Sequence, residues 1–86
     1  MNKGFIIYRN ESYILSDYIK RELKKKYKDR NIVITLDVEN ELLKGFNISI
    51  SDKLFKYSNY FKISSYNNTY ELINSIFKVF SYLIAT

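Results

Sequence analysis

The chain has 86 residues, and 14 basic against 9 acidic side chains give it a net charge of +5 near neutral pH. A chain of this length is expected to form a single domain, residues 1–86, with one core and little room for an interior active site. Cysteine and histidine are both absent, which excludes disulfides, thiolate zinc sites and the commonest general base. We therefore expect no cofactor, no metal and no enzymatic activity.

The early apolar run, Phe5 to Tyr8, is far too short for a signal peptide. The apolar final stretch, Thr69–Ala85, contains Glu71 and Lys78, and it is too short and too polar for a good membrane span. We therefore expect a cytoplasmic protein with no membrane partner.

Three elements are expected in the first half of the chain. Gly4–Arg9 predicts a short strand with apolar residues on both faces. Residues 11–29 predict a helix, because apolar side chains recur at every fourth position. Its apolar residues are Leu15, Ile19, Leu23 and Tyr27, with Ile14 and Tyr18 beside them. Asn31–Val38 alternates between apolar and polar residues, which predicts a strand with its even-numbered side chains toward the core.

A hairpin is expected to follow. After a turn over Glu39–Lys44, residues 46–51 alternate between apolar and polar side chains and predict another strand. Asp52-Lys53 would then close a tight hairpin that sets Ile50 opposite Phe55.

The chain is expected to turn once more at Ser58–Tyr60, so that a last strand begins at Phe61 and pairs it with Tyr57. A two-residue loop would instead set Lys62 against Phe55. The longer loop is favoured because a slip of one residue would turn the apolar side chains outward.

Thr69–Ala85 predicts an amphipathic helix, with Asn68 as its N-cap and Glu71 placed to bond back to the cap. Its apolar arc consists of Leu72, Ile73, Ile76, Phe77, Val79, Phe80, Leu83 and Ile84. An arc this wide needs an apolar sheet face to lie on. The expected fold is therefore α+β in the order β-α-β-β-β-β-α, an antiparallel sheet packed on one face by two helices.

Residues 20–30 carry seven cations and two anions, so the whole excess charge of the chain lies in this segment. Such a cluster can neutralise phosphates or contact an acidic protein surface, and a solvated helix face is the alternative. Lysine dominates, and lysine lacks the bidentate fork used to recognise bases. The candidate contact residues are Lys20, Arg21, Lys24, Lys25 and Lys28.

The stretch Tyr57–Tyr70 interleaves tyrosine with serine and asparagine. Tyrosine gives a large contact area at low entropic cost, and its small polar neighbours give adaptable hydrogen bonds, as in binding loops. The same tyrosines could stack on bases. The alternative is that Tyr57 belongs to the core and that the other residues of this stretch reflect an AT-rich codon bias. The candidate partner-binding residues are Asn59, Tyr60, Tyr66, Asn67 and Tyr70.

Asp37, Glu39 and Glu41 could hold a hard cation, but no calcium-loop motif surrounds them, so a solvated turn is expected.

Small mRNA-cleaving toxins of the RelE class are similar in size and basicity. Their catalysis depends on basic and aromatic groups near the chain end, where this chain has the apolar run Phe80–Ile84.

From Ser12 to Ile84, the run of helix, strands and helix resembles a double-stranded RNA-binding domain in outline. That family has the order α-β-β-β-α with lysines at the start of its second helix. Here the matching place is Asn67-Asn68-Thr69-Tyr70-Glu71, without lysine. The resemblance implies a nucleic-acid-binding module that would use the basic first helix.

In brevity, in its bias toward Ile, Lys, Asn and Tyr, and in its lack of catalytic groups, the chain also resembles small phage or mobile-element inhibitors of host defence, such as anti-CRISPR proteins. This resemblance implies a non-catalytic inhibitor that blocks a protein or ribonucleoprotein surface in the host cytoplasm. Direct nucleic-acid binding is the alternative function.

Overall fold

The computed structural model describes the backbone of residues 4–85 and the side chains of residues 4–82. The elements in this part of the chain are α1 (Arg9–Lys26), β1 (Asn31–Glu39), β2 (Leu42–Ser51), β3 (Lys56–Lys62), the 3-10 turn η1 (Ile63–Ser65) and α2 (Thr69–Ala85). The strands form one antiparallel sheet in the order β1-β2-β3. The predicted α+β class and antiparallel sheet are confirmed, but the predicted extra strands are not present among the described residues.

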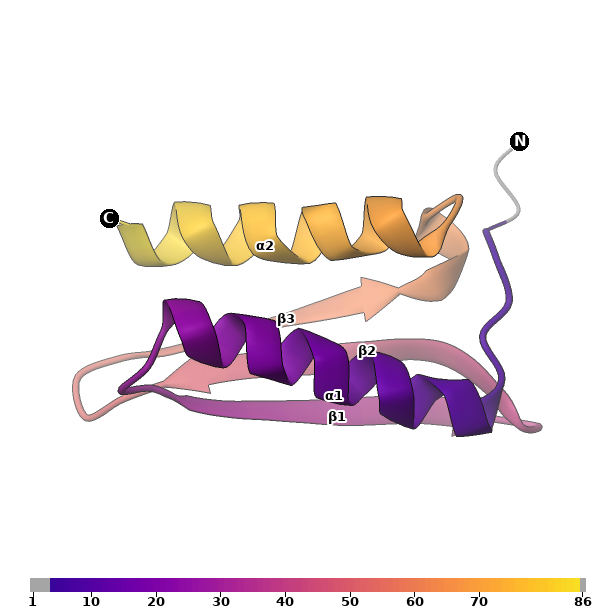
Figure 1. Ribbon diagram of the computed structural model, residues 1–86, viewed down its shortest axis with the longest axis horizontal. Helices are drawn as coiled ribbons and strands as arrows, with labels where there is room; N and C mark the ends of the chain where they lie inside the picture. The colour runs from indigo at the N-terminus through magenta and orange to yellow at the C-terminus, as the bar shows by residue number, and fades with distance from the viewer. Residues whose placement is uncertain (1–3, 86) are drawn as a thin grey trace.

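Both helices pack on one face of the sheet and run in the same direction (Figure 1). Phe46 of β2 lies at the centre of this packing. It borders the same small internal space as Ile19 of α1, and its ring centroid is 5.8 Å from that of Phe61 on β3. The ring centroid of Phe61 is in turn 6.3 Å from that of Phe80 on α2. One apolar sheet face therefore buries the apolar sides of both helices.

The predicted inward side of α2 is confirmed at Leu72, Ile76 and Phe80, which are fully buried. The Asn68 cap is also present, because its Oδ1 accepts a hydrogen bond from the Glu71 backbone N–H at 2.8 Å. The side chains of the predicted apolar residues Leu83 and Ile84 lie outside the described residues.

The predicted first strand is wrong. Gly4 has a φ of 69°, in the left-handed region, and Tyr8 is extended. The backbone meets the sheet where Tyr8 bridges Leu42 and where the Leu43 backbone N–H donates to the Ile7 carbonyl at 2.8 Å, and the side chains of Phe5 and Ile7 pack against the core. Arg9 already begins α1, so the chain turns away from the sheet before a longer ladder of hydrogen bonds can form.

The predicted turn at Ser58–Tyr60 is also wrong, because β3 continues through these residues as one strand. Ile50 pairs with Tyr57 and not with Phe55. The reason is the side chain of Asp52, whose Oδ1 accepts the backbone N–H groups two and three residues later and closes a longer turn. The register thus differs from the predicted one by two residues, a slip that keeps the apolar side chains on the core face.

Candidate functional site

Cations line one exposed side of α1 over its last two turns, and Lys28 continues the row in the turn after the helix. Ile19 and Leu23 are fully buried against the sheet, and side chains three or four residues apart share a helix face, so the intervening residues face solvent. Five predicted contact residues line one open, shallow depression together with Ile14 and Asp17. These five, which we call the basic face, are Lys20, Arg21, Lys24, Lys25 and Lys28.

Within the described residues, two cations of the basic face make a polar contact. Lys25 Nζ lies 2.7 Å from Glu22 Oε2, and Lys24 Nζ donates to the Arg30 carbonyl at 3.0 Å. The other three have no ion pair or side-chain hydrogen bond in the part of the chain described. Five positive charges at the end of α1 and in the turn after it attract anions, because Asp17 is the one acidic side chain among the residues that line this depression.

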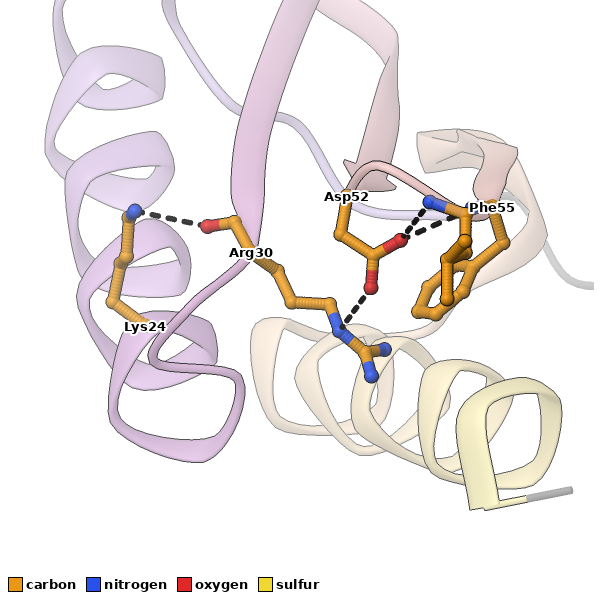
Figure 2. Close-up of polar contacts among 5 residues, drawn as sticks. Lys24, Arg30, Asp52 and Phe55 are labelled. Atoms are coloured by element: carbon orange, nitrogen blue, oxygen red, sulfur yellow. Dashed lines mark hydrogen bonds and ion pairs between the residues drawn. The ribbon is translucent and has the colours of Figure 1, made fainter.

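Arg30 belongs to the same basic segment of the sequence, but the fold uses it differently (Figure 2). Its Nε lies 3.4 Å from Asp52 Oδ2, and its guanidinium carbon lies 4.0 Å from the centre of the Phe55 ring. Through these contacts Arg30 connects the segment between α1 and β1 to the turn between β2 and β3. Lys26 also makes a tertiary contact, since its Nζ donates to Ser81 Oγ of α2 at 2.6 Å.

Exposed apolar side chains border the basic face. Ile14 and Tyr18 are predicted to lie beside the core stripe of the helix, but Ile14 is 72% exposed and Tyr18 is 40% exposed. The spacing of Ile14 from the cations already indicates that it shares their exposed face. Ile14 precedes Arg21 by seven residues, about two helical turns, so the two side chains must share a face.

The structure divides the five predicted partner-binding residues among different surfaces. Asn59 faces the helix-covered side of the sheet, whereas Tyr60 faces the open side. Tyr66 packs against the core just after η1. Asn67 and Tyr70 are exposed at the start of α2. These residues therefore do not form one contact face.

The side chain of Tyr60 makes its contacts within the sheet. Its hydroxyl donates to Asp37 Oδ2 of β1 at 2.8 Å, and its ring crosses β2 at Gly45, where a Cβ would collide with the hydroxyl. The hydrogen bond to Asp37 raises the pKa of Tyr60 above its ordinary value of 10.0, and partial desolvation and the charge of the carboxylate act in the same direction.

Two of the three carboxylates near the β1–β2 turn, Asp37 and Glu41, have protein partners of their own. Asp37 accepts from Tyr60, and Glu41 Oε1 lies 3.5 Å from Arg9 Nη1. Among residues 4–85, no group of three or more acidic side chains is arranged to hold a metal ion. Neither helix, over its described length, is long and apolar enough to cross a membrane.

No protein-family model matches the chain, and no curated protein or solved structure is significantly similar to it. The function must therefore be inferred from the exposed residues themselves.

Proposed function

We propose that this chain is a non-catalytic binding protein that holds a nucleic acid against the basic face of α1. The observation that carries the proposal is the cluster of five cations on the exposed side of α1 and the turn after it, three of them without a polar partner among the described residues. Each phosphate that such a face neutralises releases condensed counterions, so binding of any sequence is favoured at low salt. Lysine-rich faces suit contact with phosphates better than recognition of bases.

The order α-β-β-β-α with both helices on one sheet face is compatible with the outline of the double-stranded RNA-binding domain. The lysines which that family carries at the start of its second helix are missing, because α2 begins Thr69-Tyr70-Glu71. Outline alone does not establish a binding surface. The proposal depends on the charges of α1 and not on the outline.

The test is the salt dependence of binding to a fluorescently labelled 20-nucleotide oligonucleotide, measured by anisotropy. Replacing Lys20, Arg21 and Lys28 with glutamine removes three exposed cations and preserves helix propensity. We expect the slope of log K against log salt to shrink by roughly two to three.

The matched control replaces Lys53, Lys56 and Lys62 with glutamine, which removes the same charge from exposed positions near β3. We expect this control to keep most of the slope. Equal losses in the two triple variants, or no complex with the unchanged chain at low salt, would contradict the proposal.

Inhibition of a protein or nucleoprotein, as in the anti-CRISPR class, is the second candidate. The observation that favours it is the open side of the sheet, where Asn47 Nδ2 donates to Ser58 Oγ at 2.8 Å and Ser49 Oγ lies 3.2 Å from the same oxygen. Tyr60 and Val33 are each 47% exposed on that side. Tyrosine with small polar neighbours on rigid strands is suited to protein recognition.

A pull-down from lysate treated with nuclease tests this candidate. Capture of one protein by the unchanged chain and by the basic-face triple variant, but not by Ser58→Arg, would favour the open sheet side. Capture that disappears with nuclease treatment would favour nucleic-acid binding.

A further inference from the structure

One exposed aromatic ring lies next to the basic face, and a second lies about two turns before it on α1, in the space that Arg9 and Glu41 also line. Tyr18 is 40% exposed and stands three residues before Arg21, while Tyr13 is 53% exposed and stands seven residues before Lys20. Side chains at both spacings share a helix face. Ile14 lies four residues before Tyr18 and is 72% exposed. The cations therefore continue directly into a small surface of rings and one aliphatic side chain.

A duplex and a single strand would use this surface differently. In a duplex the bases are stacked on one another, so a helix surface meets mainly phosphates and groove edges. In a single strand the bases can leave the stack and lie on an aromatic ring, and their phosphates can follow a nearby row of cations. Only the second arrangement gives Tyr18 and Ile14 an apolar partner.

We propose that α1 binds single-stranded nucleic acid in preference to duplex, with phosphates along the basic face and an unpaired base stacked on Tyr18. This inference rests on the proposed nucleic-acid function and names its ligand more closely. Recognition is independent of sequence, because every base has a π-face and lysine does not distinguish base edges.

An anionic membrane is the other surface that an exposed basic helix can fit, but such helices insert a broad apolar side. Here the apolar stripe of α1, with Ile19 and Leu23, is buried on the sheet. The exposed side offers a single aliphatic residue, Ile14, between polar and aromatic groups. Phosphates and bases match this mixture better than acyl chains do.

The experiment compares the full chain on a labelled 20-nucleotide oligo(dT) and on a 20-base-pair duplex, at the same low salt. We expect the single strand to bind on the order of tenfold more tightly. We also expect Tyr18→Leu to weaken single-strand binding by roughly 5- to 100-fold, with duplex affinity and salt slope unchanged.

Two further variants act as controls. Tyr18→Phe keeps the ring and should keep the affinity. Tyr70→Leu removes a tyrosine that is 76% exposed on α2 and should change nothing. Far-UV circular dichroism checks that each variant folds.

Equal or tighter duplex binding, or an unchanged single-strand affinity in Tyr18→Leu, would overturn the single-strand inference and leave nucleic-acid binding standing. Absence of both complexes at low salt would overturn the proposed function itself. Binding to phosphatidylglycerol vesicles without binding to either nucleic acid would assign the surface to a membrane and refute the inference.

Discussion

The basic face of α1 and the tyrosine-rich stretch from Tyr57 to Tyr70 are both conspicuous in the sequence, but the fold treats them differently. Four of the five cations lie on one side of α1, because a helix returns to the same face every three to four residues, and Lys28 joins them from the turn that follows the helix. The tyrosine-rich stretch passes through a strand, a 3-10 turn and the start of a helix. Its neighbours in sequence therefore separate in space.

The two regions also differ in how far their polar groups are already used. The Tyr60 hydroxyl donates a hydrogen bond to Asp37, and the Tyr60 ring packs over Gly45. Most of the basic face has no such partner among the described side chains. A charged side chain without a protein partner is free to bind a ligand, whereas a polar group that already has a partner stabilises the fold. The variants below test this division between the two regions.

The largest expected effect on stability is at Gly45. Gly45→Ala would place a Cβ against the Tyr60 ring and 2.8 Å from the Phe61 carbonyl oxygen, a backbone atom that cannot easily move. We expect a loss of about 2–3 kcal/mol in the free energy of unfolding, measured by urea denaturation. Adding Tyr60→Ala should recover part of this loss and not all of it. A Gly45→Ala variant as stable as the unchanged chain would show that the ring does not lie over this glycine.

A smaller effect separates two arginines of the same basic segment. Arg30→Gln removes the ion pair with Asp52 and the contact with the Phe55 ring, and we expect it to cost about 1–2 kcal/mol of stability. Arg21→Gln, the matched variant on the basic face, should change stability by less than about 0.5 kcal/mol. Oligonucleotide affinity should show the opposite order, with the larger loss in Arg21→Gln. If Arg30→Gln also had the larger effect on affinity, the division between the two arginines would be wrong.

The smallest effect concerns the Tyr60 hydroxyl and depends on pH. The pKa of Tyr60 is raised in the folded chain, so its contribution to stability is complete below the ordinary value of 10.0 and is lost as pH rises through the folded value. Tyr60→Phe should therefore cost roughly 0.5 kcal/mol at about pH 8, and the difference should be smaller at about pH 11, above the ordinary pKa of the hydroxyl. Thermal midpoints of the two proteins at both pH values measure it. A constant difference would mean that the hydrogen bond to Asp37 does not form in solution.

The sequence predicts both helices and the inward side of each well-patterned strand, because these follow from periodicity alone. It does not predict the second hairpin. Asn59 faces inward between Tyr57 and Phe61. This polar residue interrupts the alternation of apolar and polar side chains along β3, so the sequence pattern there is typical of a loop. The Asp52 side chain then sets a turn length that no hydrophobic pattern encodes.

The cations of the candidate site could be predicted because their spacing is helical. The exposure of the neighbouring apolar side chains does not follow from the same spacing, because the apolar stripe of α1 is wide at its N-terminal end. Leu15 packs against the core while Ile14, the adjacent residue, points to solvent. Which of two adjacent apolar residues is buried depends on how the helix is rotated on the sheet, and periodicity fixes that rotation only approximately.

The most direct measurement of the central claim is a titration of the ¹⁵N-labelled chain with oligo(dT), followed by amide chemical shifts. We expect the shifted amides to cluster in residues 14–28, which comprise most of α1 and the start of the turn after it, while residues 56–62 of β3 stay unchanged. Shifts confined to β3 and its neighbours, or none at low salt, would contradict the claim that the exposed side of α1 is the binding surface.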